Sequence, residues 1–319
     1  MAISEFELIK QYFDQASVEG RRGIVKGIGD DAAIVAAPTG HEIAISIDTL
    51  VQGVHFPVNI SPADLAYRAL AVNLSDLAAS GATPWWFTLA LTLPESDEVW
   101  LQAFSQGLFE LAANARIDLV GGDTTKGPLA ITIQVAGIVR TGKALMRSGA
   151  EVGDKIYCTG TLGDGCGGLQ CWQQNLTGSD AEHLKTRFIR PQPRLIESSL
   201  LLGLANSCID ISDGLLADLA HIIAASNVGA DIDITQVPVS GPLFNQFGET
   251  ALEYALAGGD DYELCFTVSP HKADMLESAF AKQNLRLTHI GHVTESAELR
   301  CISPDGSLYT LPKSGYQHF

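Results

Sequence analysis

The spacing of apolar residues predicts alternating helices and strands in the first half of the chain. A helix is expected from Ser61 to about Ser80, because Ser61 can cap it, Pro62 fits its first turn and Gly81 can end it. A second helix is expected over 96–115, where apolar residues recur at nearly helical period: Val99, Leu101, Phe104, Leu108 and Leu111. The remaining elements expected here are a short amphipathic helix at 6–13 and strands at 32–37, 43–47, 86–93 and 129–139.

A stretch of small and polar residues at 146–154 indicates a joint, after which a second set of elements begins. Strands are expected at 155–159, 263–268 and 286–293, helices at 164–174, 193–204, 213–226 and 270–283, and a polar loop at 175–186. This order predicts an α/β (α+β) protein of two domains, an N-terminal domain over 1–147 and a C-terminal α/β domain over 148–319.

Composition narrows the classes of protein that the chain can belong to. Its 319 residues favour two domains, and a net charge of −17 argues against nucleic acid as a partner. The N-terminus has no basic segment of a signal peptide, and no apolar run reaches the ~18 residues of a membrane helix. We therefore expect a cytoplasmic protein that does not bind membranes. The six cysteines form no Cys-x-x-Cys pair, so buried thiols are expected rather than a zinc site.

Two glycine patterns resemble nucleotide-binding loops but lack necessary parts. Residues 137–144 fit a P-loop except at Ala144, where a hydroxyl should bind Mg²⁺. Residues 163–168 read Gly-x-Gly-x-x-Gly and open a predicted helix, which is typical of a dinucleotide site. No clear strand ending in an acid follows about 20 residues later, so both glycine patterns are weaker evidence than the aspartates described next.

Aspartates beside glycine or other small residues recur along the chain and are its most informative feature. Glycine allows tight turns and close approach to a ligand, and carboxylates are the hard oxygen ligands that Mg²⁺ prefers. A single aspartate of this kind is as often structural as functional, but their recurrence predicts a shared site for Mg²⁺ and phosphates. The segments are 27–31, 46–49, 73–76, 121–125, 210–214 and 258–261.

Two further side chains are candidates for the same site. His55 follows Asp48 by a short glycine-containing turn, and it is either a ligand contact or a satisfied structural histidine. Arg147 stands in a stretch of small residues, where it is either a bidentate phosphate ligand or an ordinary surface arginine.

Taken in order, these segments resemble those of thiamine-monophosphate kinases, in the superfamily of aminoimidazole ribonucleotide synthetase and selenophosphate synthetase. The resemblance runs from about residue 27 to the C-terminus, and the segments that carry it are 27–33, 48–56, 71–82, 121–125, 210–215, 258–264 and 315–319. It implies the two-domain fold of that superfamily and a homodimer in which the N-terminal sheets pair. It also implies ATP-dependent phosphorylation of thiamine monophosphate to thiamine diphosphate, the last step of thiamine diphosphate biosynthesis. The transfer is expected to be direct, with no acid–base residue and no phosphoenzyme.

The resemblance also assigns expected roles to individual residues. Several Mg²⁺ ions are expected on Asp30, Ser46, the backbone of Ile47, Asp48, Asp76, Asp123, Asp210 and Asp213. ATP is expected at Gly122, Asp123, Arg147 and Ser212. Thiamine monophosphate is expected at His55, at Asp261 or Glu263, and at Tyr316.

The chain departs from the family pattern at two places and excludes two sibling activities. Ile47 replaces a hydroxyl, and Asp260 replaces a more common glutamate in the Gly-Gly-Asp-Asp-Tyr-Glu segment. Selenophosphate synthetase needs a reactive cysteine near the N-terminus, and the first cysteine here is Cys158. A hydrogenase-maturation dehydratase carries a C-terminal cysteine, whereas this chain ends in Phe319. A non-catalytic nucleotide-binding regulator and a dinucleotide-dependent dehydrogenase remain as alternatives from other classes.

Overall fold

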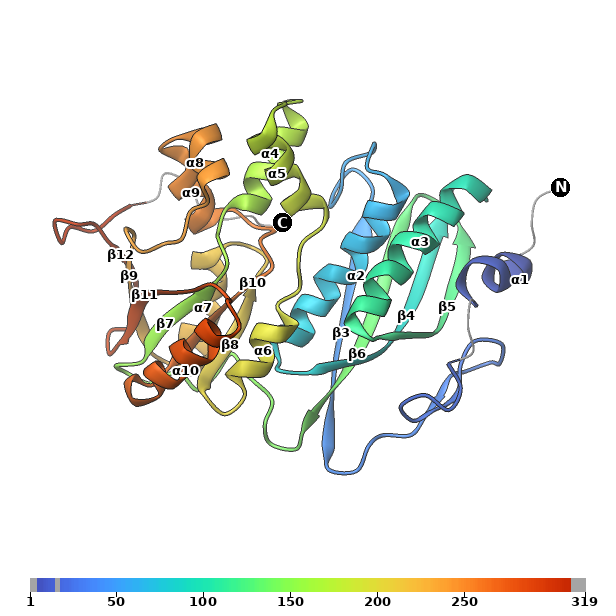
Figure 1. The fold of residues 1–319 in the computed structure, drawn as a ribbon, viewed down its shortest axis with the longest axis horizontal. Coiled ribbons are helices and arrows are strands. Elements are labelled where there is room, and N and C mark those ends of the chain that lie inside the picture. Colours follow the sequence, from blue (N-terminus) through green and yellow to red (C-terminus); the bar gives the residue numbers. More distant parts are fainter. Residues whose placement is uncertain (1–4, 15–17, 311–319) are drawn as a thin grey trace. The chain divides into compact units, whose positions relative to one another are not determined.

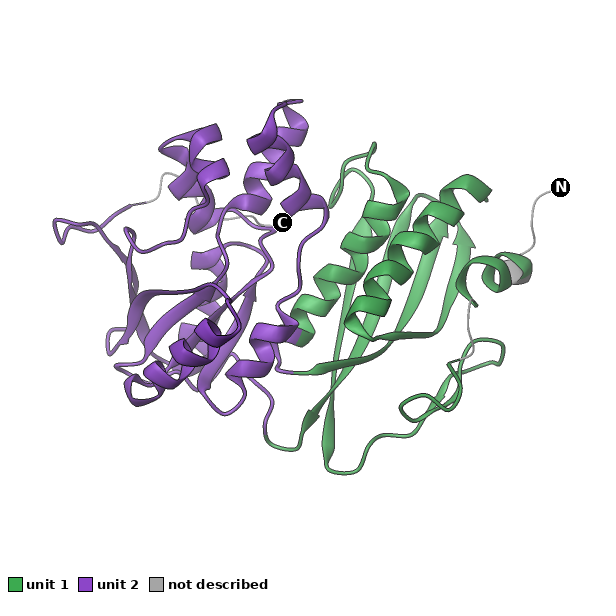
Figure 2. Cartoon of the chain, in the orientation of Figure 1, with its two compact units in different colours: residues 1–77, 82–142 green, residues 78–81, 143–319 purple. Residues whose placement is uncertain are grey.

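The computed structural model describes residues 5–14 and 18–310, and these form two compact units (Figure 2). The first unit contains residues 1–77 and 82–142, and the second contains 78–81 and 143–319. Both units mix helices and strands, which confirms the predicted α/β (α+β) class. No helix among the described residues is long and apolar enough to cross a membrane.

The first unit is built on a four-stranded sheet in the order β3-β6-β4-β5, with α2 and α3 over one face (Figure 1). Its elements are α1 (Glu5–Leu8), the π-helix η1 (Ile9–Phe13), β1 (Ile24–Lys26), β2 (Ile34–Val35), β3 (His41–Val51), α2 (Pro62–Ala79), β4 (Thr83–Leu93), α3 (Glu98–Ala115), β5 (Asp118–Lys126) and β6 (Ala130–Arg140). Strands β3 and β5 form the two edges of this sheet.

The two long helices of this unit lie where the apolar pattern predicts them, whereas one strand is longer than predicted and another was not predicted. The predicted helices at 61–80 and 96–115 become α2 and α3, and the side chain of Asp97 caps α3 by accepting the N–H groups of Val99 and Trp100. The strand expected at 43–47 is much longer, because β3 pairs with β6 along its whole length. Strand β5 was missed, since its glycine-rich sequence lacks the alternation of a half-buried strand.

The second unit is built on a six-stranded sheet in the order β12-β9-β11-β7-β10-β8. Its elements are β7 (Lys155–Thr159), α4 (Asp164–Gln173), α5 (Ser179–Ile189), α6 (Leu195–Leu201), β8 (Ala205–Ile211), α7 (Leu215–Ser226), β9 (Gly229–Asp233), α8 (Gly241–Phe247), α9 (Thr250–Ala257), β10 (Glu263–Val268), α10 (Pro270–Lys282), β11 (Leu287–Thr294) and β12 (Leu299–Ile302). The prediction of a loop at 175–186 was wrong, because Ala181, Leu184 and Phe188 bury one face of α5.

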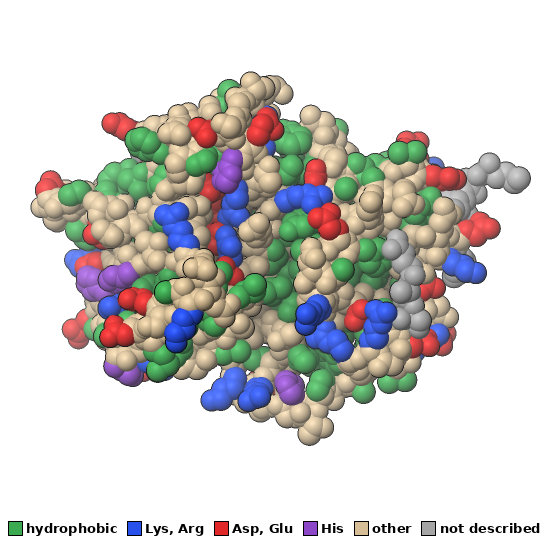
Figure 3. Space-filling view, in the orientation of Figure 1, with side chains coloured by type: hydrophobic (Ala, Val, Ile, Leu, Met, Phe, Trp, Pro, Cys, Tyr) green, Lys and Arg blue, Asp and Glu red, His purple; other side chains and the backbone are tan. Residues whose placement is uncertain are grey.

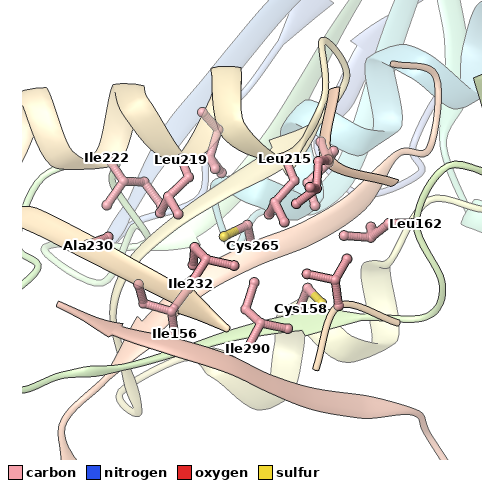
Figure 4. Packing of buried hydrophobic residues seen from close by; sticks show 14 of the residues in the cluster. Ile156, Cys158, Leu162, Leu215, Leu219, Ile222, Ala230, Ile232, Cys265 and Ile290 are labelled. Carbon is pink, nitrogen blue, oxygen red and sulfur yellow. The ribbon is translucent and has the colours of Figure 1, made fainter. Parts of the chain in front are cut away.

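Alternating side chains of the central strands separate two cores in this unit. Ile156 and Cys158 of β7 join a cluster with Leu215, Leu219 and Ile222 of α7 (Figure 4). The intervening Tyr157 lies in the other cluster, which includes Leu276 and Phe280 of α10. The sheet is therefore covered on both faces, and this buried framework supports the loop between β8 and α7.

All six cysteines are free, and five of them are buried, as the sequence predicted. Burial raises the pKa of the Cys166 thiol to about 12, and it raises the pKa of the Cys158 and Cys208 thiols well above the usual value. These thiols are therefore small core residues rather than nucleophiles.

Candidate active site

In the first unit, Ser46, Asp48 and Asp76 form a small polar cluster between a strand and a helix. Ser46 and Asp48 lie two residues apart on β3, so they share one face of the strand. Asp76 projects from α2, and its Oδ2 accepts a hydrogen bond of 2.5 Å from the Ser46 hydroxyl. The structure therefore brings together three residues that are far apart in sequence.

Electrostatics within this cluster favour a bound cation. Burial, together with the negative charge of Asp76, raises the pKa of Asp48 to about 6. A divalent ion bound between two neighbouring carboxylates would relieve their mutual repulsion. The donors are hard oxygens, which suits Mg²⁺. Across the described residues, no three His, Cys, Asp or Glu side chains are grouped so that they could hold a metal ion, and this cluster has two carboxylates and one hydroxyl.

Asp123 and Asp30 lie elsewhere in the same unit. Asp123 is exposed on β5, the edge strand opposite to β3, with β4 and β6 between them. Its neighbour Gly122 packs so closely on β4 that a Cβ would lie 1.9 Å from the carbonyl oxygen of Leu89. Asp30 is exposed in the turn between β1 and β2, where its Oδ1 accepts the N–H of Asp31.

Ile47 and His55 flank the polar cluster. The side chain of Ile47 is 60% exposed, and its position in β3 leaves only the backbone as a ligand for a cation. The Nδ1 atom of half-buried His55 accepts the N–H of Val51 at 3.0 Å. The neutral ring then carries its proton on Nε2, which is a donor suited to a phosphate or a ring nitrogen.

In the second unit, the candidate residues Asp210, Ser212 and Asp213 lie where β8 passes into α7. Asp210 is buried near the end of β8, whereas Ser212 and Asp213 are half-buried in the connecting loop. The buried carboxylate of Asp218 accepts the N–H groups of Ser212, Asp213 and Gly214. Burial raises the pKa of Asp218 to about 6 although these three hydrogen bonds lower it.

Arg147 is exposed and is held through its backbone. Ser226 at the end of α7 donates to the Arg147 carbonyl and accepts the N–H groups of Gly149 and Ala150. Helix α7 has 12 residues and is about 18 Å long, so the backbone of Arg147 lies at the opposite end of α7 from Asp213.

The segment 258–263 holds the two acids expected to bind the substrate, and both are buried with several partners. Asp261 is 1% exposed and accepts the N–H groups of Gly163 and Gly165 at 2.6 and 2.9 Å. Glu263 is completely buried and accepts from Thr159, Arg187 and Arg194. Burial raises the pKa of Asp261 well above its usual range, although the two N–H groups lower it.

The residues beside these acids belong to the same predicted segment, but the sequence did not single them out as substrate contacts. Asp260 and Tyr262 are half-buried, and both adopt positive φ angles of 70° and 53°. Residues other than glycine rarely adopt positive φ angles, and backbone strain of this kind concentrates at ligand-binding sites. The Tyr262 hydroxyl donates to Asp260 Oδ1 at 3.1 Å, so the two side chains form one surface. The apolar run that follows could have revealed this, because Glu263 is the first residue of β10, a strand that is buried at every position. The predicted aromatic contact, Tyr316, lies outside the described residues.

Internal carboxylates occupy the starts of helices α4 and α7. The Gly-x-Gly-x-x-Gly pattern at 163–168 does open α4, but the N–H groups of Gly163 and Gly165 already bind Asp261. The N–H groups that precede α7 bind Asp218 in the same way. Two N–H groups at the start of α4 are therefore bound to a carboxylate of the protein itself, whereas in a typical dinucleotide fold the helix start binds a phosphate.

Basic side chains do not compensate for the negative charge of the chain. On the face shown in Figure 3, Lys and Arg side chains occur in small separate groups among acidic and neutral ones. The whole chain contains 20 Lys and Arg against 37 Asp and Glu. An anionic ligand at the aspartates would therefore need metal cations.

Comparison with known proteins agrees with this geometry. Residues 29–139 match the AIR synthase related protein, N-terminal domain, and residues 151–303 match the corresponding C-terminal domain. The chain is 50% identical to the thiamine-monophosphate kinase of Escherichia coli K12, with 100% of this chain and 99% of the relative covered. It is 44% identical to the Haemophilus influenzae enzyme of that name, with the same coverage.

Solved structures lead to the same family. A thiamine-monophosphate kinase from Stenotrophomonas maltophilia K279a superposes with a TM-score of 0.85 at 44% identity, and 91% of this chain and 93% of that chain are covered. AaThiL complexed with AMPPCP and TMP gives a TM-score of 0.80 at 30% identity, with 89% of each chain covered. The chain therefore belongs to the thiamine-monophosphate kinases, within the AIR synthase related proteins.

Proposed function

We propose that this protein transfers the γ-phosphoryl group of ATP to thiamine monophosphate, yielding thiamine diphosphate and ADP. The observation that carries the proposal is similarity over the full length to kinases of this name, together with a solved relative, AaThiL, in complex with AMPPCP and TMP. The candidate site supports it, because Ser46, Asp48 and Asp76 lie together and offer hard oxygen donors that would hold a cation of the kind that phosphoryl transfer requires.

The chemistry needs positioning and charge neutralisation rather than a strong base. A phosphate oxygen of thiamine monophosphate forms a bond to the γ-phosphorus, and the bond to the β,γ-bridging oxygen breaks as ADP leaves. The attacking oxygen is already an adequate nucleophile, so we propose direct in-line transfer without a phosphoenzyme. Bound Mg²⁺ ions would neutralise the repulsion between the two anionic substrates.

The chain supplies oxygen ligands for these ions in both units. We propose that Ser46, Asp48 and Asp76 hold one group of Mg²⁺ ions, with Asp30, Asp123 and the Ile47 backbone as further ligands. Asp210 and Asp213 would bind ions from the second unit. ATP would contact Gly122, Asp123, Arg147 and Ser212.

For thiamine monophosphate, we propose contacts with His55 and with the Asp260–Tyr262 surface. Asp261 and Glu263 would then act indirectly, because their oxygens are already occupied by protein donors. Tyr316 remains the proposed aromatic contact near the C-terminus.

We also propose that the protein is a homodimer in which the N-terminal sheets pair. On the edge strand β3, Ile43, Ile45 and Ile47 share one face and are 42%, 59% and 60% exposed. Apolar side chains on an uncovered edge strand favour association with another chain. The six free thiols suit a reducing compartment, and we place the protein in the cytoplasm.

A direct assay tests the proposed activity. The protein is incubated with ATP, Mg²⁺ and thiamine monophosphate, and the products are separated by chromatography. Equal amounts of thiamine diphosphate and ADP are expected. Binding of ATP without formation of ADP would indicate a regulator instead, and ADP without thiamine diphosphate would indicate a different acceptor.

Replacement of His55 should weaken thiamine monophosphate more than ATP. We expect His55→Ala to raise KM for thiamine monophosphate about tenfold, because a hydrogen bond to a charged group is lost. His55→Asn keeps an acceptor for the Val51 N–H but lacks Nε2, so it should show the same selective loss. His41→Ala, at the exposed start of β3, is the matched control. An equal rise of both Michaelis constants would indicate a structural histidine.

Deletion of residues 315–319 should likewise act on one substrate. An aromatic ring against the cationic thiazolium contributes roughly 0.5–2 kcal/mol, so KM for thiamine monophosphate should rise by a fewfold to tens of fold. KM for ATP and the melting temperature should barely change. A large fall in melting temperature without a selective change in KM would show that the tail is a structural latch. Tyr316→Leu in the full-length chain separates loss of the ring from loss of the tail.

A further inference from the structure

Asp218 lies on the first turns of α7 and binds the loop that precedes its own helix. Its side chain is 3% exposed, and one oxygen, Oδ2, accepts the N–H groups of Ser212, Asp213 and Gly214 at 3.0, 3.0 and 3.1 Å. Three consecutive backbone donors thus converge on a single atom. This fixes the conformation of the loop more tightly than a cap with one hydrogen bond.

The opposite side of the same loop is held by the segment that follows α9. The carbonyl oxygens of Ile211 and Ser212 accept the N–H groups of Tyr262 and Asp260, each at 2.8 Å. Close packing leaves no space at Gly259, where a Cβ would lie 2.4 Å from the Ser212 oxygen. The donors of the loop are therefore held by Asp218 and its acceptors by residues 260–262.

This arrangement leaves the side chains of Ser212 and Asp213 half-buried while their backbone is fixed. A ligand set that is already in position binds a cation or phosphate without a cost for ordering the loop. A charged group is costly to bury, and an apolar residue would fill the same space at lower cost. The carboxylate of Asp218 is therefore explained by the three N–H groups that it binds.

We propose that Asp218 is a positioning residue for ATP and Mg²⁺, which holds Ser212 and Asp213 in the geometry that binds them. The proposal rests on the proposed function, in which Ser212 and Asp213 are ligands. Asp218 accepts the Ser212 N–H, and the Ser212 carbonyl accepts the Asp260 N–H. By holding Ser212, Asp218 therefore also helps to position Asp260, which links the nucleotide loop to the substrate surface.

Kinetics of three variants test the proposal in the full-length protein. Asp218→Ala should lower kcat/KM for ATP about a hundredfold and raise the Mg²⁺ concentration for half-maximal rate, because small displacements of ligands have effects of this size. Asp218→Asn keeps an acceptor oxygen and should lose less, about tenfold. The control is Asp231→Ala, which should leave KM for ATP unchanged. Asp231 lies on β9, and its carboxylate binds Arg300 of β12 at 2.7 Å.

Hydrogen exchange gives a readout that does not depend on turnover. In the protein without nucleotide, the amides of residues 212–214 should exchange about ten- to a hundredfold faster in Asp218→Ala than in wild type, while those of β10 stay protected. If Asp218→Ala fails to fold, Asp218→Asn carries the same measurements. Unchanged exchange in a folded variant would overturn the proposal.

A double-mutant cycle with Asp213→Ala separates positioning from general structural damage. If Asp218 acts through the loop, the two losses in kcat/KM should combine to less than their product, since the part of the Asp218→Ala loss that passes through Asp213 is already gone. Multiplicative losses would overturn the proposal, and so would wild-type kinetics of Asp218→Ala alone. If Asp213→Ala itself has wild-type kinetics, the proposed role of the loop is wrong and the proposal falls with it.

Discussion

A mixture of two inactive variants, Asp48→Ala and Asp123→Ala, should regain about a quarter of the wild-type rate. Each variant alone should lose nearly all turnover, as should Asp76→Ala, because each removes a proposed ligand of the Mg²⁺ ions. Mixing and refolding the two proteins gives heterodimers in about half of the dimers. One of the two sites in each heterodimer then contains both an intact Asp48 and an intact Asp123.

The expectation follows from the positions of these carboxylates in the sheet. Asp48 lies on β3 and Asp123 on β5, which are the two edges of the order β3-β6-β4-β5. Three strand spacings of about 4.8 Å separate them by about 14 Å, which is too far for both to ligate one ion. The expected recovery therefore rests on the proposal that, in the homodimer, Asp123 of one protomer completes the site that contains Asp48 of the other.

The controls are straightforward. Asp48→Ala mixed with Asp76→Ala should stay inactive, because both residues belong to one cluster and each protomer then lacks part of it. No recovery with Asp48→Ala and Asp123→Ala in verified heterodimers would show that the site lies within one protomer. Recovery with Asp48→Ala and Asp76→Ala would show that these two residues do not act in one cluster of the same protomer. Melting curves without Mg²⁺ provide a second check, since loss of one of two repelling carboxylates should not lower stability.

Much of the fold could be predicted because apolar periodicity is local information. Helices α2 and α3 bury apolar faces at regular spacing, and their caps and terminal glycine are written in the sequence. Strand β5 could not be found in this way, because Gly121 and Gly122 give no alternation and the strand exists through its pairing with β4. Helix α5 was hidden for a related reason, since its short apolar stripe lies within a polar stretch.

The candidate site was predictable in its residue types but not in its connections. Recurring aspartates beside small residues identified Asp48 and Asp76, and the structure adds the hydrogen bond between Asp76 and Ser46. The role of Asp218 could not be predicted, because its three partners are backbone groups that any sequence would carry. One signal was present, namely an acid within the apolar sequence Leu-Leu-Ala-Asp-Leu.

Glu263 shows most clearly how the structure changes an expectation from family motifs. The sequence offered Asp261 or Glu263 as the substrate contact. Both oxygens of Glu263 are occupied, Oε1 by Arg187 and Arg194 and Oε2 by Thr159 and Arg194. A carboxylate has about four acceptor positions, so these donors fill them. A substrate would have to displace an arginine to reach it.

Glu263→Ala should therefore destabilise the protein strongly, by about 3–5 kcal/mol in the free energy of unfolding of the second unit. The side chains of Arg187 and Arg194 are 14% and 17% exposed, and the variant would leave their guanidinium groups without the anion that they share. A loss of this size lowers the melting temperature of a unit of this length by on the order of ten degrees, which calorimetry can measure.

Two further variants decide between this structural role and substrate binding. Glu197→Ala removes the other carboxylate that binds Arg194, at 3.3 Å, and should cost less because Glu263 remains. Glu263→Gln keeps the shape but not the charge, so it should also lower the melting temperature. KM for thiamine monophosphate, measured on folded Glu263→Gln at low temperature, should stay within a fewfold of wild type. A rise of a hundredfold with unchanged stability would instead make Glu263 a direct substrate ligand and require Arg187 or Arg194 to release it when thiamine monophosphate binds.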